Sequence, residues 1–308
     1  MDLDIPVVLL IFNRPELTKK VFNIVANVKP RQLFIVADGP LKSGDIRLCE
    51  EARCIVNLIN WDCEFKINFS DTNLGCCRRV SSGLDWVFSQ VEEAIILEDD
   101  CVPDPSFFSF CQSLLNYYRH DERVWVISGN NFQNGQWRGD GSYYFSRYNH
   151  CWGWATWRRA WQNFQHELDS WPKLKDSGLL KSVLLDPVEY KYWSNIFERL
   201  YLENKPDSWA YRWTYSCWIN NALSILPNVN LVSNIGFGEN STHTADPDSH
   251  LANIPAKELR GIIHPPFLIR DEKADQYTFD HTFNGIELRR SNRLFFRLRR
   301  KVLNLLSI

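Results

Sequence analysis

The chain has 308 residues, of which 44% are hydrophobic and 23% charged, as is usual for a globular protein that buries a full core. Its formal net charge of −2 excludes the broadly basic surface that nucleic-acid binding requires, so no nucleic-acid partner is expected. The composition also excludes disordered and low-complexity classes. This length favours one large domain or two closely fused halves.

Nine cysteines are present, but they form no CxxC pair, and no histidine stands at zinc-finger spacing. We therefore expect free thiols in a reducing cytoplasm. No apolar run approaches the roughly 18 residues that a membrane span needs. The sequence predicts neither a transmembrane helix nor a secretory signal.

Short apolar runs alternate with helical patterns in the first half, which predicts βαβ units around a mainly parallel sheet. The first strand is expected over 5–12, and a helix to about 26 follows, because Pro15 stands early in it. Further strands are expected over 33–37, 65–69, 94–97 and 124–128, with helices over about 44–59, from a turn at 73–75 to about 90, and over about 106–118.

The composition changes beyond Gly129, because ten of the thirteen tryptophans lie between Trp137 and Trp218. We therefore place a boundary near residue 130. The expected parts are a first half over 1–130, a second half over 131–286, and a C-terminal segment over 287–308.

The strongest signal is the acidic triplet Glu98, Asp99 and Asp100 at the end of a predicted buried strand. Polar residues also follow the other strands, at 13–14, 38–39 and 73–75, and open α/β sheets bind ligands at that edge. Three adjacent carboxylates repel one another, which favours a hard divalent cation, Mg²⁺ or Mn²⁺. The alternative is a solvated acidic turn that caps the following helix.

Aromatic residues give a second signal. Trp152 and Trp154 flank Gly153 and are candidates for stacking on a sugar ring. Trp157 and Trp161 stand four residues apart, a helical spacing that favours the core.

Two further features leave alternatives open. Asp207 begins an aromatic helix, where it is an N-cap, a general base held by the helix terminus, or both. The segment from Gly236 to Thr244 is either a mobile loop that closes on phosphates or an ordinary surface loop. The histidines outside this loop, His150 among them, receive no role.

In their order, these motifs resemble nucleotide-sugar glycosyltransferases of the GT-A fold. Within that group they look most like bacterial family 2 type proteins related to N-acetylglucosaminyltransferase I, over about residues 5–244. The motifs are Phe12-Asn13-Arg14-Pro15, Ala37-Asp38-Gly39, Asn73-Leu74-Gly75, Ile96-Leu97-Glu98-Asp99-Asp100, Gly153-Trp154-Ala155 and Asp207-Ser208-Trp209. The implied fold is α/β, with a Rossmann-like, mostly parallel mixed sheet flanked by helices and a fused acceptor-binding half.

The resemblance implies a role for particular residues. Asp100 would bind Mn²⁺ or Mg²⁺, and Asp207 would be the catalytic base, although Ser208 stands where the family usually has a second acid. The nucleotide-sugar would contact Asn13, Arg14, Asp38, Arg79, Glu98, Asp99, Trp154 and His243.

The implied activity is inverting transfer of a sugar from a nucleotide-sugar, with UDP expected from Asp38, to a saccharide or lipid-linked glycan acceptor. In this scheme Asp207 deprotonates the acceptor hydroxyl, and the cation stabilises the leaving diphosphate.

Two other classes compete with this hypothesis. A nucleotidylyltransferase also combines an α/β sheet, a metal-binding carboxylate and a sugar phosphate, but it should carry a glycine-rich basic loop after the first strand, which 12–15 lacks. A non-enzymatic carbohydrate-binding protein would use the tryptophans, but it leaves the acidic triplet unexplained.

The C-terminal segment over 287–308 carries seven basic residues against one glutamate. Its apolar residues recur at helical spacing, which predicts a basic amphipathic helix lying on an anionic membrane surface. The enzyme would then be cytoplasmic and peripheral on the inner face of the membrane. Alternatively, the apolar stripe docks on the protein itself or on a second subunit.

Overall fold

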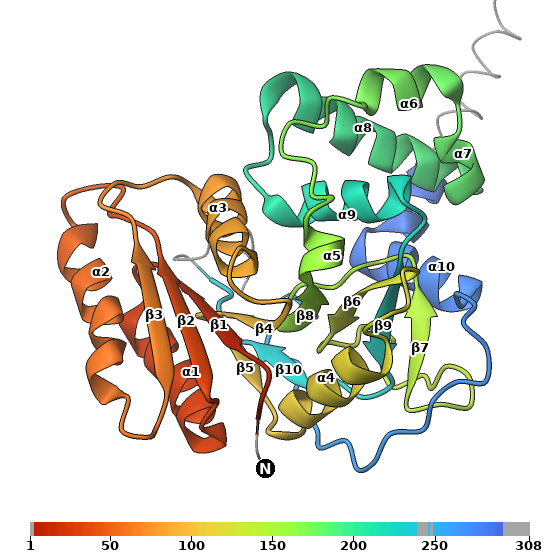
Figure 1. The fold of residues 1–308 in the computed structure, drawn as a ribbon. Helices are drawn as coiled ribbons and strands as arrows, with labels where there is room; N and C mark the ends of the chain where they lie inside the picture. The colour runs from red at the N-terminus through yellow and green to blue at the C-terminus, as the bar shows by residue number, and fades with distance from the viewer. Residues whose placement is uncertain (1–2, 239–245, 247–248, 292–308) are drawn as a thin grey trace, which may run out of the picture.

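The computed structural model describes residues 3–238, 246 and 249–291. An eight-stranded sheet in the order β3-β2-β1-β4-β8-β6-β9-β7 forms its centre, with helices on both faces (Figure 1). The strands of this sheet are β1 (Val7–Ile11), β2 (Gln32–Ala37), β3 (Glu64–Phe69), β4 (Glu93–Glu98), β6 (Val124–Ser128), β7 (Tyr143–Ser146), β8 (Trp154–Trp157) and β9 (Leu223–Pro227). The predicted α/β, Rossmann-like class is confirmed.

Four neighbouring strands, β3, β2, β1 and β4, run parallel. The run of β1 is apolar at every position because the strand is buried on both sides. Successive side chains point to opposite faces of a sheet. Accordingly, Val7 and Leu9 join one hydrophobic cluster, and Val8 and Leu10 join the other.

The helices divide between these two faces. The cluster around Val7 contains residues of α1, α2 and α4, and the cluster around Val8 contains residues of α3, α5, α6, α7, α8 and α9. The helices are α1 (Pro15–Val28), α2 (Asp45–Arg53), the 3₁₀ turn η1 (Cys54–Leu58), α3 (Cys76–Phe88), α4 (Ser106–Tyr117), α5 (Arg158–Trp161), α6 (Trp171–Ser177), α7 (Leu180–Val183), α8 (Pro187–Glu203), α9 (Trp209–Ile219) and α10 (Glu272–Thr282).

Strand β8 lies between β4 and β6 and is antiparallel to both. The sheet therefore continues without a break across residue 130, where β4–β8 pairing joins the two predicted halves. A small second sheet pairs β5 (Cys101–Pro103) with β10 (Val232–Asn234). The division into halves remains a prediction.

The C-terminal segment is described only to residue 291, where 285–291 is helical. Its Leu288 packs against the hydrophobic cluster around Val8. Arg289 forms ion pairs with Asp186, at 2.7 Å, and with Asp280. Residues 292–308, which carry most of the predicted basic face, lie outside the described residues, and membrane binding remains a prediction. Among the described helices, none combines the length and apolar character needed to cross a bilayer.

Candidate functional site

The acidic triplet meets Arg14 where β1 and β4 lie side by side. Because these strands are parallel neighbours, their carboxyl ends open at the same edge of the sheet. This is also the point where the strand order reverses, since the chain passes from β1 to β2 on one side and later returns to β4 on the other. The Arg14 guanidinium pairs with Asp99 and, at 2.9 Å, with Asp100.

Two carboxyls of the triplet, those of Glu98 and Asp99, have raised pKa values. Burial, together with the charges of Asp100 and Asp99, raises the pKa of Glu98 to about 8. Burial raises the pKa of Asp99 to about 6, although the Arg14 charge opposes this shift. Burial disfavours the charge of Arg14, yet Asp99 and Asp100 raise its pKa above the ordinary value. Perturbed groups of this kind concentrate at functional sites.

Asp38 follows β2, and its side chain binds backbone N–H groups of two loops. Its buried carboxylate accepts hydrogen bonds from the backbone N–H groups of Gly39, Leu74 and Gly75, at 2.9, 2.9 and 3.2 Å. Burial nevertheless raises its pKa from the ordinary value. Asp38 thus ties the loop after β2 to the loop that begins α3.

Asp207 caps a helix, but not the one that it precedes. Its two carboxylate oxygens accept the N–H groups of Cys76 and Cys77, at 2.9 and 3.0 Å, in the first turn of α3. A carboxylate at a helix N-terminus satisfies unpaired donors and complements the helix dipole. The sequence predicted a cap on α9, whereas Asp207 caps α3 through a contact across 130 residues of chain.

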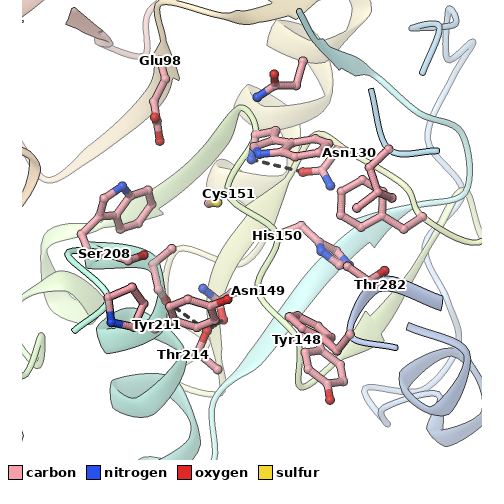
Figure 2. A pocket seen from close by; sticks show the side chains of 18 of the residues that line it. Glu98, Asn130, Tyr148, Asn149, His150, Cys151, Ser208, Tyr211, Thr214 and Thr282 are labelled. Atoms are coloured by element: carbon pink, nitrogen blue, oxygen red, sulfur yellow. Dashed lines mark hydrogen bonds between the residues drawn. The ribbon is translucent and has the colours of Figure 1, made fainter. Parts of the chain in front are cut away.

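Two pockets open at this edge and share Arg14, Cys76 and Glu98. The smaller, of about 280 Å³, lies at the carboxyl ends of β1 and β2 and is called here the strand-edge pocket. The larger, of about 460 Å³, lies toward α9 and is called the aromatic pocket (Figure 2). Besides the shared residues, the strand-edge pocket is lined by Asn13, Asp38, Asn73, Arg79, Asp99 and Asp207, and the aromatic pocket by Asp100, Asn130, Phe132, Tyr148, His150, Trp152, Trp209, Tyr211 and Thr282.

The carboxylates fit a divalent cation by their donor chemistry. Within the described residues, no group of three or more His, Cys, Asp or Glu side chains is arranged to hold a metal. Mg²⁺, however, commonly binds one or two carboxylates and takes its other ligands from water and substrate phosphates. Glu98 and Asp100 both line the aromatic pocket and would serve as those ligands. The assignment of Asp100 as a metal ligand remains a prediction.

The other predicted contact residues occupy different places. Asn13 lines the strand-edge pocket and donates to Asp45 at 3.1 Å. Arg79 lines the same pocket and donates to the backbone of Ala37 at 3.1 Å, so it also holds the end of β2. Trp154 is 1% exposed and stacks on Trp209 inside the core.

Of the remaining aromatic and loop residues singled out from the sequence, one lines a pocket, two are buried, and others lie outside the described residues. Trp152, not Trp154, lines the aromatic pocket. Trp157 and Trp161 are buried, as their spacing predicted. His243, with its neighbours Ser241 and Thr242, lies outside the described residues.

Sequence reasoning missed much of the aromatic pocket. Asn130 follows β6, so the same strand-end signal that found Asp38 could have found it. His150 and Thr282 carry no sequence signal, because a pocket brings them together from segments far apart in the chain.

No protein-family model and no curated protein matches this sequence. Among solved structures, a UDP-glucose pyrophosphorylase complexed with UDP-glucose is 8% identical, with a TM-score of 0.32 over 52% of this chain and 78% of its own. The 4-diphosphocytidyl-2C-methyl-D-erythritol synthase of Anaerococcus prevotii DSM 20548 is 10% identical, with a TM-score of 0.34 over 60% and 86%. The inositol-1-phosphate CTP transferase of T. maritima is 9% identical, with a TM-score of 0.30 over 52% and 73%.

None of these three proteins is a glycosyltransferase, and the predicted resemblance to GT-A glycosyltransferases is contradicted. The predicted activity, sugar transfer to an acceptor with Asp207 as general base, depended on that resemblance and is also wrong. Three of the residues that suggested this activity have structural roles. Asp38 and Asp207 accept hydrogen bonds from backbone N–H groups, and Trp154 is in the core. At such low identities and TM-scores, the matches assign no activity to this chain.

Proposed function

We propose that the chain is a nucleotidyltransferase that joins a nucleoside triphosphate to a sugar phosphate, giving a nucleotide-sugar and pyrophosphate. The observation that carries the proposal is the pair of pockets that meet at Arg14 and Glu98. Such an arrangement suits a reaction in which two phosphate-bearing substrates are joined at a common point.

The strand-edge pocket suits the nucleotide. It lies at the strand-order reversal, where open α/β sheets bind nucleotides. Its lining includes the apolar residues Leu10, Ile11 and Val36 and the polar residues Asn13 and Arg79. The aromatic pocket is left for the second substrate.

In the proposed reaction, an oxygen of the sugar phosphate attacks the α-phosphorus of the nucleotide. The bond from that phosphorus to the bridging oxygen breaks, and pyrophosphate leaves with its electron pair. Arg14 lines both pockets, and its guanidinium, which pairs with Asp99 and Asp100 in this structure, would orient the phosphates and stabilise charge that develops between them. A divalent cation held by Glu98 and Asp100 would supply further screening of the phosphate charge.

Strict dependence on that cation follows from the segment after β1. Residues 12–15 contain one arginine and no glycine, so this segment lacks the glycine-rich basic character that cradles a triphosphate through backbone N–H groups. A triphosphate bound here would therefore rely mainly on Arg14 and the cation for charge compensation.

The test is pyrophosphate release from each of the common nucleoside triphosphates with a set of hexose 1-phosphates, with Mg²⁺, with Mn²⁺ and with a chelator. We expect release that requires the cation. Arg14→Lys should lower the rate by about 10²-fold, because lysine lacks the planar guanidinium fork. Arg47→Gln is the matched control, since Arg47 pairs only with Glu51 on the exposed face of α2 among the described residues.

The reverse reaction gives an independent check, because labelled pyrophosphate should be incorporated into triphosphate when a nucleotide-sugar is supplied. Absence of both activities across the substrate set would overturn the proposal. Sugar binding without either activity would instead favour the non-enzymatic carbohydrate-binding class.

A further inference from the structure

One wall of the aromatic pocket carries polar atoms that lack partners. Asn130 Nδ2, His150 Nε2 and Thr282 Oγ1 are buried, and within the described residues none has a hydrogen-bond partner. All three residues line this pocket, and Figure 2 shows them on one side of it, opposite Ser208 and Tyr211. Buried polar groups are nearly always paired in folded proteins, so three unpaired atoms on one wall indicate that something else binds them.

The Asn130 amide has a donor that is not used within the described residues. Its Oδ1 accepts the backbone N–H of Trp152 at 3.2 Å, so Nδ2 is the end that remains available. Asn130 is 1% exposed and His150 is 6% exposed. By contrast, Thr214 across the pocket already donates to Asn149 at 2.7 Å.

The three side chains are uncharged. Burial lowers the pKa of His150 to about 3, so its imidazole is neutral and offers one donor or one acceptor at Nε2 according to its tautomer. Neutral donors and acceptors complement hydroxyl groups, which both donate and accept. The ionisable residues Arg14, Glu98 and Asp100 line the same pocket, and Figure 2 shows Glu98 apart from His150 and Thr282.

Aromatic rings adjoin the polar wall. Phe132 packs edge-on against His150, with ring centroids 4.6 Å apart, and against Trp152, at 5.0 Å. Flat apolar rings beside fixed hydrogen-bonding groups are the usual means of binding a pyranose, whose ring has apolar C–H faces and a polar rim.

We propose that Asn130, His150 and Thr282 form the subsite that binds the ring hydroxyls of a hexose phosphate, with the phosphate directed toward Arg14. The inference rests on the proposed function in naming a sugar phosphate as the second substrate. It adds the residues that select the sugar, and these neutral groups favour an uncharged hexose ring over a charged one.

The test measures binding without turnover, by calorimetry of the full chain with glucose, galactose, mannose and N-acetylglucosamine 1-phosphates. At least one should bind more tightly than inorganic phosphate. Thr282→Val removes a hydroxyl at nearly constant shape and should weaken that binding by about 3- to 10-fold, the effect of losing one neutral hydrogen bond. His150→Phe keeps the ring but removes its nitrogens, and should give a similar loss.

Ser224→Ala is the matched control. Ser224 Oγ on β9 is also buried and unpartnered within the described residues, but Ser224 does not line the pocket. This variant should bind the sugar phosphate as the wild type does. Affinity for inorganic phosphate should be unchanged in all three variants, because the phosphate is directed elsewhere.

Deoxy-sugar phosphates then locate the contact. The analogue that lacks the hydroxyl bound by Thr282 should lose affinity in the wild type but show no further loss in Thr282→Val. Failure of every hexose phosphate to bind better than phosphate, or equal affinities in wild type, Thr282→Val and His150→Phe, would overturn the subsite. Ring binding without pyrophosphate release would overturn only the proposed reaction.

Discussion

Asp207 joins two segments that are 130 residues apart, by accepting backbone N–H groups at the start of α3. We expect Asp207→Ala to lower the free energy of unfolding by about 1 kcal/mol, the usual effect of removing a helix cap. Urea unfolding measures this loss. Ser208→Ala is the control, because the Ser208 side chain makes no capping bond to the described helix α9; equal stabilities for the two variants would contradict the cap.

His150 predicts a pH dependence of stability. Its folded pKa of about 3 lies below the ordinary value of 6.5, so below pH 6.5 the unfolded chain binds the proton more readily than the folded chain. The stabilisation is complete above that pH and is lost as the pH falls toward 3. Between pH 7.5 and 5.5, the wild type should therefore lose about 1.4 kcal/mol more than His150→Gln.

Denaturant unfolding of both proteins at these two pH values checks the prediction. The other shifted groups, Glu98 and Asp99 among them, are common to both proteins, so their contributions cancel in the difference. Parallel curves for wild type and His150→Gln would show that His150 titrates normally.

At the scale of elements, the turn that begins α3 depends on a glycine. Gly75 has φ +82°, and a Cβ there would lie 2.7 Å from Asp207 Oδ2. Gly75→Ala should therefore incur both the cost of a positive-φ backbone, roughly 1 to 3 kcal/mol, and displacement of the cap. Gly135→Ala isolates the first effect, because Gly135 has φ +79° with no atom within 4 Å among the described residues.

Thermal and urea unfolding should show Gly75→Ala to be the less stable of the two glycine variants. That excess should disappear when both substitutions are made in an Asp207→Ala background, because no carboxylate remains to be displaced. A persistent excess would mean that the added methyl group meets something other than Asp207.

The sequence predicted elements well where burial alone dictates them. β1 is apolar throughout, and β4 is apolar from Ala94 to Leu97, because both faces are covered; a continuous apolar run between turn signals indicates such a strand. It did not predict β8, because Trp154 was interpreted as a ligand-binding residue and Trp157 as a core residue at helical spacing. That strand is specified by its pairing with β4 and β6, which local sequence does not reveal.

The site was predictable at the strand ends but not across the chain. Arg14, Asp38 and Glu98 were singled out because each stands at the end of a parallel strand or just after it, and all three line the strand-edge pocket. Asp207 was singled out correctly as a helix cap but placed on the wrong helix. One wall of the aromatic pocket is formed by Asn130, His150 and Thr282, which come together only after folding. Neither their spacing nor their residue types could therefore predict a subsite.

At the scale of the whole molecule, the uninterrupted sheet predicts cooperative unfolding. Strand β8 belongs to the second predicted half but lies between β4 and β6 of the first. Neither half therefore forms a continuous sheet from its own strands alone. Tryptophan fluorescence reports mainly on the second half, where ten of the thirteen tryptophans lie, and far-UV circular dichroism reports on the whole. The two unfolding curves should coincide; separate transitions would support two independently folding halves.

The central position of β8 also has a consequence for synthesis on the ribosome. Translation delivers β1 to β4 first, at roughly 5 to 20 residues per second, and the outer edge of β4 then has no strand beside it. That edge remains open until Trp154–Trp157 has emerged and inserted against it. The nascent chain thus spends several seconds with an exposed, apolar strand edge, the kind of surface that pairs with other chains. Chaperone demand during expression should therefore arise from the order of synthesis, even though the finished sheet covers both sides of β4.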